Sequence, residues 1–196
     1  MPRSKERTPE LRERILDHAL ALLAEEGVSG VTTRAVAARA GTSAPAIYEL
    51  FGDKAGLVRA LFFEGYERLV ARFADLRPPT GRPGDIVDVA VQFRAFALDH
   101  PHLFEVMYTR PFASFAPGPE EHRMGAKAQA ALVDRATRCV EAGTLRGDPV
   151  DISHALLGLG IGLATQETAG WLGRTVADRD RRWERAIDAL LAGYSA

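Results

Sequence analysis

The sequence lacks the features of secreted and membrane proteins. It has one cysteine, Cys139, so no internal disulfide can form, and a lone thiol favours a reducing compartment. The most apolar run, Ala155 to Ala164, is ten residues long, whereas a membrane-spanning helix needs about 20. The segment Met1 to Glu10 is polar and lacks the apolar core of a signal peptide. We therefore expect a soluble, cytoplasmic protein.

An excess of charge of one sign is also missing. The chain carries 25 Lys and Arg against 26 Asp and Glu, a net charge of −1, which excludes a protein that coats nucleic acid through general basicity. Residues 1–56 hold eight basic and eight acidic side chains and are neutral overall. Nucleic-acid binding would therefore depend on local clustering near phosphate of Arg3, Lys5, Arg7, Arg34 and Lys54, together with helix N-termini.

Patterns that carry catalysis or metal binding are absent as well. There is no G-x-S-x-G, no Walker sequence and no glycine pattern for a dinucleotide. His100 and His102 are two residues apart, a poor spacing for joint ligation from a helix, and no cysteine or paired carboxylate completes them. We predict no enzyme activity, no metal and no cofactor, and we interpret Cys139 as a core thiol.

Helical periodicity runs through the chain, and no stretch alternates cleanly enough to predict a sheet. Thr8-Pro9-Glu10 is favourable chemistry for a helix start, and Gly27 is a candidate end. We predict an all-α fold of about nine helices, near 9–27, 33–40, 44–50, 53–76, 86–100, 103–108, 120–142, 149–172 and 176–191. The prolines and glycines between residues 76 and 84 make the clearest break.

Residues 32–51, TTRAVAARAGTSAPAIYELF, have the form of a helix-turn-helix. Ala37 and Ala40 are small enough for two short helices to approach closely, and Gly41 tolerates the sharp turn. Apolar side chains of the motif can pack against the first helix: Val36, Ile47 and Phe51. We expect the exposed side of the second short helix to hold Ser43, Ala44, Ala46 and Tyr48.

These residues resemble the TetR family of bacterial repressors. The match consists of T-T-R at 32–34, Ala37, A-G-x-S at 40–43, I-Y at 47–48, Phe51, Lys54 and Leu57, and it covers about residues 8–68. Leu50 departs from the pattern, since the family usually has a histidine or an aromatic there. Residues 93–108 look more loosely like the start of the WHG-type regulatory domain of the family, although Leu157 and Ile161 stand where that subgroup often has Trp and His.

The resemblance implies a homodimeric repressor that binds a palindromic DNA operator and releases it when a small molecule enters the C-terminal domain. It divides the chain into a DNA-binding domain at 1–56 and a domain for ligand binding and dimerisation at 57–196. The DNA-binding residues that we predict are Thr32, Thr33, Arg34, Ser43, Ala44, Pro45, Ala46, Tyr48 and Lys54.

Two apolar patterns near the C-terminus suit packing against a second copy. Four side chains of the last expected helix recur at spacings of four, three and four, which makes a seam for helix packing. The helix before it is apolar on two faces and must be covered on both. We predict a dimer interface made of Ile152, Leu156, Leu159, Leu163, Trp183, Ile187, Leu190 and Tyr194.

Aromatic residues gather in the middle of the chain near several histidines, a composition typical of a cavity wall with a few polar anchors. We predict an apolar or amphipathic effector bound among Phe93, Phe96, Phe104, Tyr108, Met124, Ile161 and Thr165, with Phe63 and Tyr66 as the link to the DNA-binding part. Two alternatives stay open: a ligand-blind architectural DNA-binding protein and an all-helical enzyme. Ligand titration against operator binding separates the first from a regulator, and activity screening separates the second.

Overall fold

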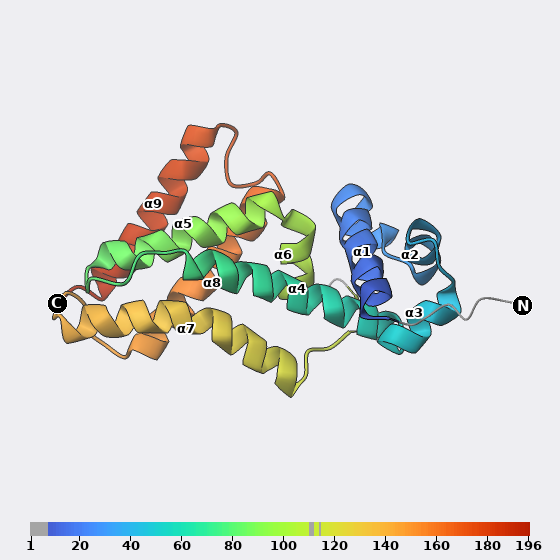
Figure 1. The fold of residues 1–196 in the computed structure, drawn as a ribbon. Coiled ribbons are helices and arrows are strands. Elements are labelled where there is room, and N and C mark those ends of the chain that lie inside the picture. Colours follow the sequence, from blue (N-terminus) through green and yellow to red (C-terminus); the bar gives the residue numbers. More distant parts are fainter. Residues whose placement is uncertain (1–7, 110–111, 114) are drawn as a thin grey trace, which may run out of the picture. The chain divides into compact units, whose positions relative to one another are not determined.

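The computed structural model describes residues 8–109, 112–113 and 115–196. Within these residues the fold is all-α, as predicted, and an isolated bridge between Leu145 and Ser195 is its single β-type pairing. Figure 1 shows the nine helices: α1 (Pro9–Gly30), α2 (Thr33–Arg39), α3 (Ala44–Phe51), α4 (Lys54–Ala74), α5 (Pro83–Asp99), α6 (Pro101–Tyr108), α7 (Pro119–Glu141), α8 (Pro149–Thr168) and α9 (Val176–Gly193).

Polar side chains before the first turn fix where several helices begin. Thr8 accepts a hydrogen bond from the backbone N–H of Leu11 at 3.3 Å, and Thr32, Asp148 and Thr175 cap α2, α8 and α9 in the same way. Each cap satisfies an amide that has no partner inside its helix. The cap at Thr8 is the helix start that the sequence predicted, and α8 begins at residue 149, as expected.

One helix end agrees with the sequence prediction and one differs from it. At Gly27 the backbone leaves helical geometry, with φ 68° and ψ −165°, and closes the first helical stretch as expected; a second short stretch, joined to it in α1, runs on to Gly30. Helix α8 stops at Thr168 because Gly170 turns the backbone at φ 78° and the N–H groups of the next two residues bond back to the carbonyl of Gln166. The loop so formed buries Leu172 and leaves Trp171 81% exposed.

The chain forms two compact units. The first contains residues 1–66 and 100–121, and the second contains residues 67–99 and 122–196. The division between these compact units falls inside α4, between Tyr66 and Glu67. The functional boundary after residue 56 that the resemblance implies stays a prediction. Helix α6 and the segment after it belong to the same unit as the helix-turn-helix.

In the first unit, α1 packs on α2 and on α6, and α2 packs on α3. Its fully buried side chains include Ile15, Ile47, Leu57 and Phe104, which come from four different helices. The apolar side chains at helical spacing along α1 are all buried: Leu11, Ile15, Ala19, Leu22 and Leu23. Burial of one apolar stripe on each helix holds these helices together.

In the second unit, α8 packs on both α5 and α9 (Figure 1). Gly160 of α8 is buried next to α5, where a Cβ added to it would lie in ordinary van der Waals contact with the ring of Phe93, at 3.4 Å. Cys139 is buried in the same unit, as predicted, and burial raises the pKa of its thiol. None of the helices in the described ranges is long and apolar enough to span a membrane.

Candidate nucleic-acid interface

The turn between α2 and α3 is built as the sequence predicted. Gly41 has φ 63°, in the left-handed region that favours glycine. Ala37 and Ala40 are buried at the crossing of the two helices, where larger side chains would push them apart. Val36 and Ile47 are completely buried beneath the turn. The geometry is that of a helix-turn-helix, with α3 as the helix that fits a major groove.

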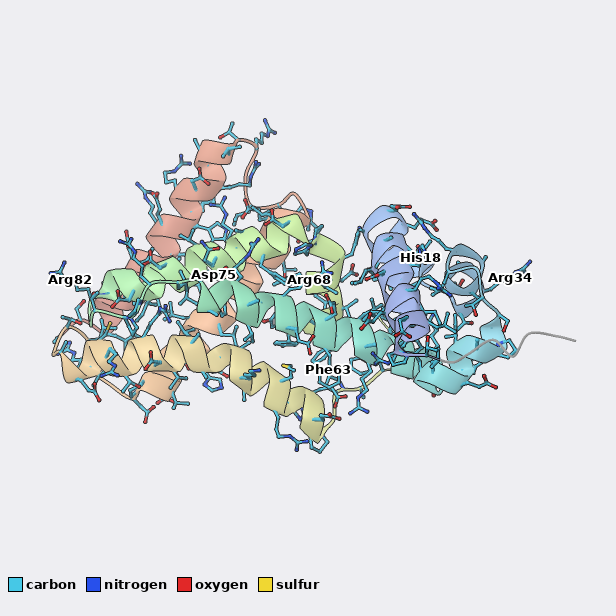
Figure 2. All side chains as sticks on the ribbon, viewed as in Figure 1. His18, Arg34, Phe63, Arg68, Asp75 and Arg82 are labelled. Atoms are coloured by element: carbon cyan, nitrogen blue, oxygen red, sulfur yellow. The ribbon has the colours of Figure 1, made fainter. Side chains whose placement is uncertain are left out.

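Hydroxyl groups and one arginine cover the outer side of this motif. The hydroxyl groups of Thr33 and Tyr48 lie 3.4 Å apart and join α2 to α3, and the Tyr48 side chain is 47% exposed. Ser43 precedes α3, and its side chain makes no capping hydrogen bond. Arg34 is exposed and projects from α2 on the side away from α1 (Figure 2). Such groups can donate hydrogen bonds to phosphate oxygens.

One predicted contact residue is on the wrong side of α3. Ala46 is only 7% exposed, so the expectation that it faces outward is wrong. At 100° per residue, Ala46 and Ile47 both point into the core of this short helix. The side chains that are exposed instead are Pro45 and Glu49, with Ala44 partly exposed. The sequence prediction did not include Glu49, because it selected small and hydroxyl-bearing side chains without working out which positions of the helix point outward.

Several basic residues of the first unit are already engaged within it. Arg39 donates two hydrogen bonds of 2.6 Å to the carboxylate of Glu25, and this pairing lowers the pKa of Glu25. The guanidinium of Arg12 lies 5.0 Å from the centroid of the Phe51 ring. Arg3, Lys5 and Arg7, which the sequence suggested for phosphate binding, lie outside the described residues.

Lys54, another predicted contact, is the first residue of α4. The carboxylate of Asp53 caps this helix end by accepting from the N–H of Gly56 at 2.8 Å. A Cβ at Gly56 would overlap the carbonyl oxygen of Phe51, so the joint between α3 and α4 requires glycine. The Lys54 ammonium lies 5.2 Å from the centroid of the Phe112 ring, a contact that local sequence gave no means to foresee.

Four of the predicted ligand residues come together in the first unit. The rings of Tyr66 and Tyr108 have centroids 5.9 Å apart, and those of Phe104 and Tyr108 are 4.9 Å apart. Phe63, on α4 (Figure 2), joins this cluster through Phe62, whose ring centroid lies 6.0 Å from that of Phe63 and 4.8 Å from that of Tyr66. The Arg59 guanidinium lies 5.5 Å from the centroid of the Phe63 ring. Burial raises the pKa of Tyr66 and raises that of Tyr108 well above its usual range, so both phenols stay protonated near neutral pH.

The other five predicted ligand residues lie in the second unit. Phe93 and Phe96 of α5 are buried, Met124 and Ile161 are partly exposed, and Thr165 is exposed on α8. Two surface hollows of this unit, of about 470 and 370 Å³, contain none of the nine. The first lies beside Thr80 and Arg138, and the second beside Arg72 and Gln92. No cluster of metal-ligating side chains occurs in the described ranges.

The predicted dimer residues divide into two groups. Five of the eight are buried inside a single chain, and their side chains therefore do not reach its surface: Ile152, Leu156, Leu163, Trp183 and Ile187. Leu159, Leu190 and Tyr194 are partly exposed. The sequence shows that these apolar side chains must be covered but not whether the same chain or a second copy covers them. In the structure, other parts of the same chain cover most of them.

A buried carboxylate that the sequence did not single out ties three helices of the second unit. The Glu167 side chain on α8 is 3% exposed and accepts two hydrogen bonds, of 2.8 and 2.7 Å, from Arg94 of α5. From α9, the indole N–H of Trp183 donates to Glu167 at 2.7 Å, and Arg179 lies 3.3 Å away. Burial raises the pKa of Glu167, but these donors outweigh it, and the pKa lies below its ordinary value.

Solved structures share this fold over nearly the whole chain. A protein of unknown function from Rhodococcus sp. RHA1 is 25% identical, with a TM-score of 0.79 and coverage of 100% of both chains. A TetR variant from Acinetobacter baumannii AYE, in complex with minocycline, is 21% identical (TM-score 0.65; 91% of this chain, 93% of the other). FadR from Bacillus subtilis, in complex with stearoyl-CoA, is 16% identical (TM-score 0.71; 93% and 98%).

No curated protein matched the sequence significantly. Two family models match it, one for the tetR family of bacterial regulatory proteins at residues 15–61 and one for the tetracyclin repressor-like C-terminal domain at residues 86–190. The first spans the helix-turn-helix described above, and the second alone covers more than half of the chain. The chain therefore belongs to the TetR family of transcription regulators.

Proposed function

We propose that this regulator is a repressor that binds a palindromic operator as a homodimer and leaves it when a small molecule binds. The proposal of DNA binding rests on the side chains exposed on the outer side of the helix-turn-helix. There Arg34, Ser43 and Tyr48 are exposed around α3, while the residues beneath them are buried. In a two-fold dimer, two such motifs read half-sites roughly 34–36 Å apart, one turn of DNA.

The first turn of α3 suggests what the motif reads. Ala44 and Pro45 have no side-chain donor or acceptor, so their contacts with bases are apolar, and the thymine methyl is the apolar group of the major groove. Loss of one buried methyl is worth about 0.8 kcal/mol, or about fourfold in affinity. Replacing thymine by deoxyuracil at contacted positions should therefore weaken binding about fourfold for each methyl.

The operator is found by selecting genomic fragments at ~100 mM salt. Enrichment of a palindrome supports the proposal, and failure to enrich one contradicts it. Tyr48→Phe and Lys54→Ala should weaken binding to every sequence, because phosphate contacts carry no base information. Lys54→Ala should also reduce the salt slope by about one for each subunit. Deoxyuracil in the spacer between half-sites is the matched control for the thymine test.

The dimer must use side chains that one chain leaves exposed. On α8, Gly158 and Gly162 are exposed with open space around them, and Leu159 and Ile161 beside them are partly exposed. An apolar helix face of this kind suits close packing against a second copy. Gly162→Leu should fold normally and sediment as a monomer, while Gly84→Leu, at an equally open site, should stay dimeric. A dimeric Gly162→Leu protein would place the interface elsewhere.

For the effector we propose an apolar or amphipathic molecule that contacts the aromatic cluster of the first unit, Phe63, Tyr66, Phe104 and Tyr108. Phe63 and Tyr66 lie on α4, nine and twelve residues beyond Lys54, or about 13–18 Å along the helix. A ligand that binds better to one position of α4 shifts Lys54 with it. Coupling of about 1–3 kcal/mol lowers operator affinity roughly 5- to 150-fold.

A small-molecule screen that measures thermal shift and operator release together tests this mechanism. A ligand that releases the operator, and releases it less well from a Phe63→Ala protein, supports it. A ligand that stabilises the protein without changing operator affinity contradicts it and favours the ligand-blind architectural protein. Turnover of the ligand would favour the enzyme alternative. The contacts expected from Phe93, Phe96, Met124, Ile161 and Thr165 stay a prediction for the same screen.

A further inference from the structure

The Lys54 ammonium is held by a residue far away in the sequence. It lies 5.2 Å from the centroid of the Phe112 ring, within the range of a cation–π contact, and Phe112 itself is 6% exposed. At the first position of α4 the positive end of the helix dipole disfavours a cation. A long, rotamer-rich side chain would otherwise be free to move there. The Phe112 ring therefore attracts the Lys54 ammonium and restricts the conformations of its side chain.

Phe112 lies in the segment between α6 and α7, which we call the α6–α7 segment, and several contacts seat its described residues on α4. The ring of Phe115 lies 5.4 Å from that of Phe62, and its N–H donates to the carbonyl of Phe112 at 3.1 Å. Just after this segment, in the first turn of α7, Glu120 accepts a hydrogen bond of 2.5 Å from Arg59 of α4, and the buried carboxylate of Glu121 accepts another from the same arginine. These contacts all lie within the first unit.

We propose that Phe112 is a positioning residue for operator binding, because its ring holds the Lys54 ammonium where it meets a DNA phosphate. The inference rests on the proposed DNA-binding function. It follows that operator affinity depends on where the Phe112 ring lies relative to the Lys54 ammonium.

The expected effect follows from the strength of a cation–π contact. A partly exposed contact contributes roughly two- to fivefold in a binding constant. A dimer carries two copies, so Phe112→Leu should weaken operator binding roughly 4- to 25-fold. Phe115→Leu is the matched control, because it removes an equal aromatic ring from the same segment without touching Lys54. It should change operator affinity less than twofold.

The test is a double-mutant cycle measured by fluorescence anisotropy with the selected operator. Phe112→Leu should weaken binding in the wild-type background and have no further effect in a Lys54→Met background. Phe112→Tyr, which keeps the aromatic face, should retain most of the affinity. If the losses from Phe112→Leu and Lys54→Met simply add, the positioning role is refuted. Tighter binding by Phe112→Leu would mean that the ring withholds Lys54 from DNA, which also refutes it.

A measurement without DNA separates the inference from the proposed function. The ring current of Phe112 should shift the Cε protons of Lys54 upfield in an NMR spectrum of the full-length protein. Phe112→Leu should abolish that shift, and Phe115→Leu should leave it. An absent shift refutes the inference even if the operator binds. A shift that is present in a protein that selects no palindrome refutes the proposed function instead.

Discussion

Removal of the Glu167 carboxylate should be among the most destabilising single changes in the second unit. The side chain is 3% exposed and receives hydrogen bonds from Arg94 and Trp183. Glu167→Ala leaves the guanidinium without its two-bond partner and the buried indole N–H without an acceptor. Asp180 remains, 2.7 Å from Arg94, so the arginine keeps one exposed ion pair.

The loss of unfolding free energy can be estimated from the two groups that lose their acceptor, the Arg94 guanidinium and the Trp183 indole N–H. Breaking a buried ion pair by removing one partner costs about 3–5 kcal/mol, because the remaining charge stays desolvated. Glu167→Gln keeps an oxygen that can accept from Trp183 and loses only the charge, for about 1–3 kcal/mol. For a chain of this size, 1 kcal/mol shifts Tm by about 2–4 °C. We expect losses of about 6–20 °C for alanine and about 2–12 °C for glutamine.

Circular dichroism at a fixed protein concentration measures these changes, since dimerisation makes Tm depend on concentration. Arg138→Gln is the control, because that side chain is more than half exposed and its pairs with Asp134 and Glu141 are long. Exposed pairs of this kind contribute about 0–1 kcal/mol. A Glu167→Ala protein that melts within 2 °C of the wild type would refute the reasoning that the network holds α5, α8 and α9 together.

Three further outcomes follow from the same physical arguments. The pKa of Glu167 is lower in the folded protein than in the unfolded chain, where it is near 4.5. The ionised Glu167 therefore stabilises the fold fully above that pH, and this stabilisation is lost as the pH falls through the folded-state pKa. Acidification should accordingly lower Tm less in Glu167→Gln than in the wild type. Trp171 is 81% exposed and Trp183 only 4%, so acrylamide should quench wild-type emission strongly and Trp171→Phe emission weakly; equal quenching would contradict the loop structure. Gly81→Ala should lower the free energy of unfolding, measured in urea, by about 1–3 kcal/mol, because φ at this residue is 81° and the new Cβ would lie 2.9 Å from the methyl carbon of Ala142. Gly84→Ala, at a site with open space around it, should lower it by less than about 0.5 kcal/mol.

The sequence by itself determined the helices, the helix-turn-helix and the family. These depend on local chemistry: caps such as Thr8 and Asp148, the left-handed turn at Gly41, and apolar residues at helical spacing. Such signals act over a few residues and can be found in any one segment. The same local reasoning failed at Ala46, where the phase of an eight-residue helix decided which small side chain is buried.

Only the tertiary structure decided which residues meet across the chain. Phe112 reaches Lys54 over 58 positions, and Glu167 joins helices whose contact residues lie 73 and 16 positions away. No periodicity encodes such pairings, because they depend on how helices pack in three dimensions. The same holds for the predicted dimer seam: an apolar stripe requires a cover, and the fold supplies that cover for Trp183 and Ile187 from within the chain.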